Sequence, residues 1–226
     1  MKKLLFLSIS ALSMLNTYAQ EETPYGFQKN DIVISGTLNY STQNSLQKYT
    51  EPNTTPIEND SKSTQLIATP EIGYFLSNNL IIGAKLGYIH SSFKNNSSFI
   101  ENKSNGFTSG VYGRYYFSPK KRISIFTELG ATYDHIKNKS EDTEENIAIE
   151  TGSGKQKNYS LAMSPGINIF LTKNLSLTSR IGKIGYTQTK GNIHYKDEGN
   201  TNEYENSTFQ ASLSLDNFYF GVQYRI

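Results

Sequence analysis

Residues 64–88 read TQLIATPEIGYFLSNNLIIGAKLGY, and this stretch contains the pattern that decides the fold. Every second residue from Leu66 to Leu76 is apolar. After a short Ser-Asn-Asn segment, the same alternation resumes from Leu80 to Tyr88. Period-two alternation is the signature of β-strands with one apolar face, and Asn tolerates the backbone conformations of tight turns. The stretch therefore predicts a β-hairpin.

The same alternation recurs along the chain in eight segments of about ten residues each. These segments are 31–42, 64–76, 80–88, 106–117, 123–133, 157–171, 175–186 and 209–226. Two of them change phase, one near Gly182 and Lys183 and the other near Asp216 and Asn217. A single phase change within a strand is typical of a β-bulge. The sequence thus predicts eight strands, two of them bulged.

Short and long connections alternate between these segments. The short ones are 77–79, 118–121 and 172–174, and the long, charged ones lie near 43–63, 94–105, 137–156 and 188–206. This asymmetry is typical of barrels in the outer membrane of Gram-negative cells. We therefore predict an all-β fold: an eight-stranded antiparallel up-and-down transmembrane β-barrel over residues 31–226, with short periplasmic turns and long extracellular loops.

The start of the chain has the features of a secretory signal. Lys2 and Lys3 precede an apolar run from Leu4 to Leu15, and small residues at Thr17 and Ala19 suit cleavage before residue 20. We expect residues 1–19 to be a signal peptide and residues 20–30 to be a short periplasmic N-terminal segment. Without cysteine in the chain, a lipid anchor, disulfides and thiolate metal sites are excluded.

The charge balance is unremarkable. The chain has 22 Lys and Arg against 20 Asp and Glu, so removal of the two signal-peptide lysines leaves it formally neutral. Neutrality gives no support for nucleic-acid binding. We expect a monomer without cofactors. Its expected partners are outer-membrane lipid and lipopolysaccharide, and, during biogenesis, periplasmic chaperones and the barrel-assembly machinery.

The composition of the polar strand face indicates which face meets lipid. A water-exposed surface is about 25–35% charged, whereas the polar strand positions here are mostly Ser, Thr, Gly, Asn and Gln. Small polar residues suit a narrow, filled interior, so the apolar face is predicted to point outward. Aromatic residues near both ends of the strands would form two girdles. They are Tyr74, Tyr115 and Phe117 near the short turns, and Tyr40, Tyr88, Tyr133 and Tyr186 near the long loops.

A few charges interrupt the polar face at similar depth. Glu71 and Lys85 lie seven residues either side of Asn78, so a symmetric hairpin makes them cross-strand partners. The hypothesis is a mid-barrel ionic layer of Glu71, Lys85, Arg114, Glu128 and Arg180. Buried charges must be paired, so mutual neutralisation is the favoured interpretation, and ion conduction is the alternative.

Several of these stretches resemble small eight-stranded outer-membrane barrel proteins often described as the porin family. The resemblance rests on Pro70–Leu80 continuing into Gly83–Tyr88, on Gly113–Phe117, on the hairpin that begins at Pro165, and on Phe220–Ile226. It implies a location and a shape rather than a transport activity. Members of the family usually end in Phe, whereas this chain ends in Ile226.

The candidates for chemistry are few. His90, His135 and His194 are far apart in sequence and have no carboxylate at ligand spacing, so we predict no metal site. His90 and Ser92 share one strand face, which resembles part of the His, Ser and Glu set of eight-stranded lipid A deacylases, but no orienting Glu is evident.

The favoured function is therefore a closed structural or surface-interaction barrel with no catalytic activity. The alternatives are a narrow porin-like channel for small solutes or ions and, more remotely, a lipid A-modifying hydrolase. The sequence identifies no extracellular ligand for the long loops.

Overall fold

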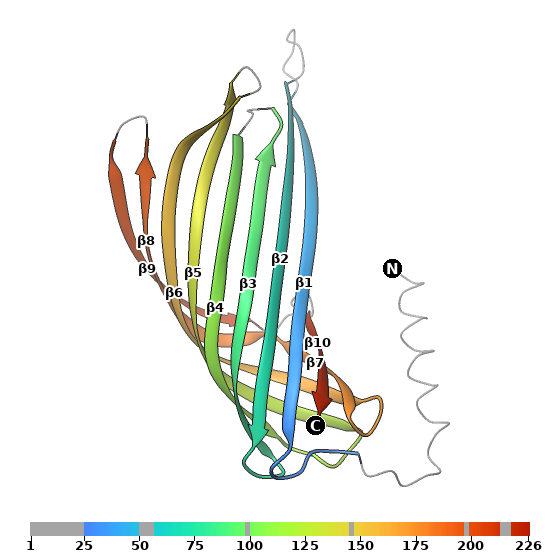
Figure 1. The fold of residues 1–226 in the computed structure, drawn as a ribbon. Coiled ribbons are helices and arrows are strands. Elements are labelled where there is room, and N and C mark those ends of the chain that lie inside the picture. The colour runs from blue at the N-terminus through green and yellow to red at the C-terminus, as the bar shows by residue number, and fades with distance from the viewer. Residues whose placement is uncertain (1–24, 50–56, 98–99, 145–146, 197–198, 213–217) are drawn as a thin grey trace.

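The computed structural model describes residues 25–49, 57–97, 100–144, 147–196, 199–212 and 218–226. The described chain is all-β (Figure 1). Its strands are β1 (Ile32–Tyr49), β2 (Ile57–Phe75), β3 (Leu80–Asn95), β4 (Ile100–Tyr116), β5 (Ile123–Glu144), β6 (Ile147–Phe170), β7 (Leu175–Ile181), β8 (Lys183–Tyr195), β9 (Thr201–Ser212) and β10 (Phe218–Arg225). Within the described residues, no helix is long and apolar enough to span a membrane.

The ten segments form a closed eight-stranded antiparallel barrel, as predicted. Gly182 divides the seventh barrel strand into β7 and β8, and residues 213–217, outside the described part, separate β9 from β10. Each consecutive pair from β1 to β6 is antiparallel, and β1–β10, β10–β7 and β7–β6 pairings close the ring. Gly166 faces Arg180, whereas Met163 faces Ile184, so one extra residue enters between β7 and β8. The first predicted bulge is therefore present, and the second lies outside the described residues.

The strands extend far into the segments that the sequence suggested were loops. The β1–β2 ladder continues to the pair Tyr49 and Ile57, and the β5–β6 ladder continues to Glu144 and Ile147. These upper strand ends are mostly polar, with only scattered apolar residues such as Leu46 and Ile149. A strand with solvent on both faces shows no alternation of apolar and polar residues. The strands predicted from that alternation were therefore shorter than the observed ones.

The barrel ring is complete only in the half that contains the short turns. β1 pairs with β10 from Val33 to Thr37, and above Thr37 the described residues of β1 pair with β2 alone. Among the described residues, β9 pairs with β8 alone. Figure 1 shows these two upper edges apart, with β9 on the left and β1 on the right. The half with the long hairpins is therefore a curved sheet above a closed base.

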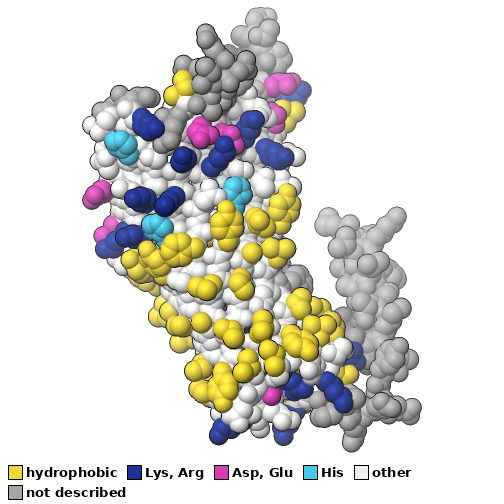
Figure 2. Space-filling model, in the orientation of Figure 1, with side chains coloured by type: hydrophobic (Ala, Val, Ile, Leu, Met, Phe, Trp, Pro, Cys, Tyr) yellow, Lys and Arg dark blue, Asp and Glu magenta, His cyan; other side chains and the backbone are white. Residues whose placement is uncertain are grey.

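Apolar side chains cover the outside of the barrel. Leu38, Leu86 and Val111 are each more than 60% exposed, as are other alternate residues of their strands. Figure 2 shows the hydrophobic side chains as a broad belt, with charged side chains and histidines above it and lysines and arginines at the lower rim. Exposure of so large a contiguous apolar surface to water is unfavourable, and soluble proteins rarely show one. The belt is therefore the lipid-facing surface of a membrane barrel.

A short N-terminal segment closes the lower mouth of the barrel. Phe27 is fully buried, and its ring stacks on Phe75 at 4.5 Å between centroids and lies 4.8 Å from Phe170. The Phe27 amide donates to the carbonyl of Pro119, and Gly26, with φ of +122°, allows the close approach to Pro119. Residues of this segment thus enter the barrel base, where they complete an aromatic core.

Candidate functional site

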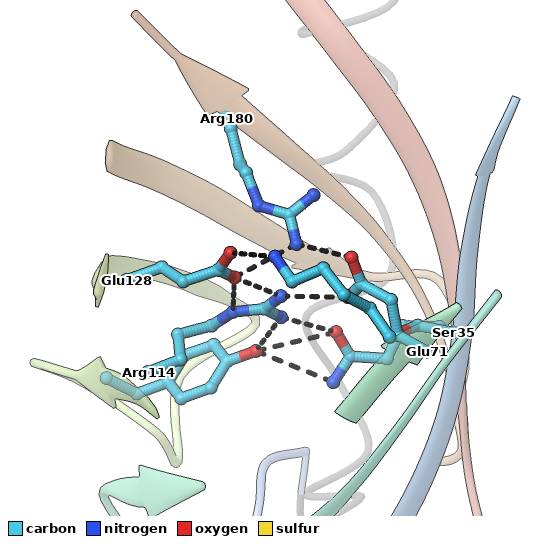
Figure 3. Close-up of polar contacts among 8 residues, drawn as sticks. Ser35, Glu71, Arg114, Glu128 and Arg180 are labelled. Carbon is cyan, nitrogen blue, oxygen red and sulfur yellow. Dashed lines mark hydrogen bonds and ion pairs between the residues drawn. The ribbon is translucent and has the colours of Figure 1, made fainter. Parts of the chain in front are cut away.

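Charged side chains from five strands meet inside the barrel, above the aromatic core. Figure 3 shows Arg114 and Glu128 entering from one wall, Glu71 from the opposite wall and Arg180 from above. Each lies on an inward strand position between lipid-facing neighbours. Lys85 joins them from β3. We call Glu71, Lys85, Arg114, Glu128 and Arg180 the ionic layer.

Arg114 is the centre of the ionic layer. Its Nε and Nη2 donate to Glu128 Oε2 at 2.9 and 2.6 Å, and Nη2 also donates to Glu71 Oε2 at 3.3 Å. The residue is only 1% exposed. Its guanidinium carbon lies 4.6 Å from the centroid of the Phe126 ring and 5.2 Å from that of Tyr112. A planar cation suits this position, because it can bond in its plane and stack on rings above and below.

The other two cations complete the pairing of the carboxylates. Arg180 Nη2 bridges Glu71 Oε1 at 2.7 Å and Glu128 Oε2 at 2.9 Å. Lys85 faces Glu71 in the β2–β3 ladder, yet its Nζ extends past β4 and lies 3.2 Å from Glu128 Oε1. Arg114 and Glu128 are direct cross-strand partners. The barrel curvature, which register alone does not reveal, brings the two carboxylates between three cations.

Neutral polar groups also form hydrogen bonds with the layer. Arg114 Nη1 donates to the Tyr116 hydroxyl at 3.0 Å and to Gln223 Oε1 at 3.3 Å, and the Ser35 hydroxyl donates to Glu71 Oε2 at 3.2 Å. Sequence reasoning considered only charges and missed these partners. The signal was available, since Tyr116 follows outward-facing Tyr115, and Gln223 lies between two outward-facing residues.

This arrangement can neutralise charge and fill space. Glu71 and Glu128 are 5% and 4% exposed, and the flanking Tyr112 and Tyr116 are buried as well. The interior of an eight-stranded barrel is just wide enough for such side chains to fill it. Three cations face two carboxylates, so the layer retains one formal positive charge. The lower half of the lumen is thus occupied by side chains.

Above the layer, β4, β5, β6, β8 and β9 line a polar hollow of about 520 Å³ in the upper sheet. Its lining includes the inward-facing amides and hydroxyls Asn102, Ser104, Asn138, Ser140 and Gln156. Tyr204 of β9 reaches into this space and donates to Gln156 Oε1 at 3.3 Å. The hollow is a polar vestibule on the side of the long hairpins.

The aromatic residues predicted for the two girdles lie on the outer surface near the expected rims. Tyr74, Tyr115 and Phe117 are 41 to 60% exposed, as are Tyr40, Tyr88 and Tyr186 at 48 to 65%. Tyr133 is half-buried because it contacts the rings of Phe107 and Tyr159. Their function as membrane girdles remains a proposal.

The histidines lie apart from the ionic layer. His90 Nδ1 is 2.7 Å from Asn105 Oδ1, and His194 Nδ1 is 3.0 Å from the Thr201 hydroxyl. Ser92 lies opposite Lys103 in the β3–β4 ladder. No carboxylate bonds to His90 among the described residues, and that part of the chain contains no group of three or more potential metal ligands from His, Cys, Asp and Glu. The structure does not bring together a complete His, Ser and Glu set around His90.

An apolar outer belt, a polar filled interior and a closed antiparallel sheet define an outer-membrane β-barrel protein. In agreement with this geometry, the family model for the outer membrane protein beta-barrel domain matches residues 4–225. The chain belongs to this family.

Among solved structures, the outer membrane protein OprG from Pseudomonas aeruginosa has the same fold. It is 12% identical, with 89% of this chain and 98% of that chain covered and a TM-score of 0.54. A major outer membrane protein from Thermus thermophilus is 12% identical, covering 87% and 98%, with a TM-score of 0.47. The outer membrane protease OmpT from Escherichia coli is 10% identical, covering 91% and 99%, with a TM-score of 0.32. No match was found among curated proteins.

Proposed function

We propose that this outer-membrane barrel is a non-catalytic, non-conducting structural or surface-interaction protein, exported by its signal peptide and assembled as a monomer. The observation that supports this most directly is the filled cross-section at the ionic layer, where Arg114 is 1% exposed between two carboxylates and two aromatic rings. Below that layer, the Phe27 core blocks the lower mouth. An ion would have to displace both to pass.

Under this proposal the functional surface is the extended upper sheet. The hairpins β1–β2, β5–β6 and β8–β9 rise above the apolar belt and expose polar side chains on their outer faces (Figures 1 and 2). Chaperones and the barrel-assembly machinery would be partners only during biogenesis. The aromatic alternation of Phe218, Phe220 and Tyr224 would serve recognition by that machinery.

Single-channel recording of the refolded chain in planar bilayers tests the proposal. The parent protein is expected to be silent, and so are Lys85→Ala and Arg114→Ala if the Phe27 core alone suffices to block the mouth. Heat-modifiable migration of the same samples provides the folding control. Reproducible conductance steps in the folded parent would contradict a closed barrel.

One observation favours a narrow channel as the second candidate. The vestibule of about 520 Å³ lies on the same side of the ionic layer as the long hairpins, and the layer has an excess of one positive charge, which would favour anions in a conducting barrel. Conductance steps whose ion selectivity changes in Lys85→Ala or Arg114→Ala would make the ionic layer a selectivity element, and the channel would then replace the closed barrel.

A further inference from the structure

Four lysines gather on the outer surface of β5, β6 and β8, directly above the apolar belt. Lys137 faces Lys155 across the β5–β6 ladder, and Lys157 faces Lys190 across the β6–β8 ladder. All four are exposed. We call Lys137, Lys155, Lys157 and Lys190 the lysine cluster. Figure 2 shows dark-blue side chains grouped above the yellow belt.

This placement of like charges is unfavourable unless an anion lies between them. Like charges directly opposite each other in a β-ladder are destabilising, and here two such pairs lie side by side. Lys190 Nζ contacts Glu205 at 3.1 Å. Within the described residues, Lys137, Lys155 and Lys157 have no carboxylate within ion-pair distance. The cluster therefore lacks enough protein counter-charge.

The lower pair of the cluster, Lys157 and Lys190, lies at the headgroup level of a bilayer, and the upper pair, Lys137 and Lys155, lies just above it. Tyr133 faces Tyr159 at the top of the apolar belt, with ring centroids 5.2 Å apart, and Lys157 and Lys155 follow two and four residues higher on β6. At about 3.4 Å per residue and a tilt of about 40°, these lysines stand about 5 and 10 Å above the tyrosine pair. The polar region of a leaflet is about 5 to 7 Å thick.

The surface at the cluster is also concave. A hollow of about 450 Å³ opens among Lys155, Lys157 and Lys190, with Glu203 and Glu205 at its β9 edge. The acidic residues lie on β9, so the side of the hollow that β6 lines is its basic part. A phosphate group there could contact several ammonium groups at once, while its lipid chains continue down over the aromatic and aliphatic belt.

We propose that the lysine cluster binds the phosphate group of a phosphorylated glycolipid of the outer leaflet. This inference rests on the membrane orientation in the proposed function, with the long hairpins outside, but not on whether the barrel conducts. Juxtamembrane lysines gain affinity for anionic lipid surfaces additively. Because the cluster lies on the outer wall, its occupancy leaves the lumen unchanged.

The test uses the full refolded chain in neutral detergent, titrated with diphosphorylated lipid A and with enzymatically dephosphorylated lipid A. The variant has Lys137→Gln, Lys155→Gln, Lys157→Gln and Lys190→Gln together. Its matched control replaces four exposed lysines of the opposite rim by Gln, at Lys29, Lys120, Lys121 and Lys173. Binding is measured by native mass spectrometry, and heat-modifiable migration verifies that each protein is folded.

The expected result is at least ten-fold weaker binding of diphosphorylated lipid A to the cluster variant, with the rim control equal to the parent and little binding of the dephosphorylated lipid. Equal affinity of parent and cluster variant would overturn the proposal. Complete displacement of the lipid by millimolar inorganic phosphate would assign the site to a free anion and overturn the lipid assignment. A conducting parent barrel that still loses lipid affinity in the variant would refute the closed-barrel function alone.

Discussion

At the scale of single residues, the stability of the barrel interior depends on ion pairs and hydrogen bonds between buried charged side chains. Glu71 accepts from Arg180, Arg114 and Ser35, so its carboxylate is held by three donors from three other strands. Removal of one partner from a buried ion pair is costly, because the charge that remains is neither hydrated nor neutralised. The ionic layer is therefore a set of interdependent residues.

Glu71→Gln is expected to destabilise the barrel by about 3 to 5 kcal/mol, since three buried cations would then share one carboxylate. Urea unfolding in lipid vesicles measures this loss. Glu58→Gln provides the matched control, because Glu58 pairs with Lys48 in an exposed hairpin where such pairs contribute about 0 to 1 kcal/mol. Equal stability of Glu71→Gln and the parent protein would rule out the network.

At the scale of elements, one glycine determines where the seventh barrel strand bends. Gly182 has φ of +71° and separates β7, which pairs with β10, from β8, which pairs with β9. The extra residue lets β7 remain in the closed ring while β8 rises with the open upper sheet. A residue with a Cβ is strained in this left-handed conformation.

Gly182→Ala is expected to cost about 1 to 2 kcal/mol in free energy of unfolding, because alanine disfavours positive φ by this amount. Gly113→Ala is the matched control on a strand. No atom lies within 4 Å of a Cβ added there, so its effect should stay within about 0.5 kcal/mol. Midpoints of urea unfolding for the two variants provide the comparison. An effect of Gly182→Ala no larger than that of Gly113→Ala would show that the bulge does not depend on glycine.

At the scale of the whole molecule, the two ends of the barrel differ in structure and in environment. The end with the short turns is closed by Phe27 and the ionic layer, and the other end is an extended polar sheet. This asymmetry predicts that the hairpins lie outside the cell and the short turns in the periplasm. The vestibule opens to the outside of the cell, and the lysine cluster faces outer-leaflet lipid, only in that orientation.

Cysteine labelling tests the orientation cleanly, because the chain has no cysteine of its own. In intact cells, a membrane-impermeant maleimide is expected to label Lys48→Cys in the β1–β2 hairpin. Lys173→Cys in the short β6–β7 turn should be labelled only after the outer membrane is permeabilised. The opposite pattern would reverse the barrel in the membrane and remove the basis for a lipid site at the lysine cluster.

Much of this molecule could be predicted from local patterns. Alternation, as in Leu80 to Tyr88, is a local consequence of the two-residue repeat of a strand, so strand number, closure and the outward face followed from the sequence. The turn at Asn78 also placed Glu71 opposite Lys85, and the ladder has that register. Patterns of this kind need no knowledge of distant segments.

Other features were decided only by the tertiary structure, because they depend on contacts between residues far apart in the chain. Curvature brings Lys85 of β3 to Glu128 of β5 instead of Glu71, and brings Gln223 to Arg114 from the opposite side of the lumen. Phe27 precedes the first strand, and its burial depends on the closed barrel base. The lysine cluster likewise exists only because strand pairing places its four lysines next to one another on the outer face of β5, β6 and β8. The sequence alone determined which residues face lipid or lumen. The packing of the closed barrel determined which of those side chains contact one another.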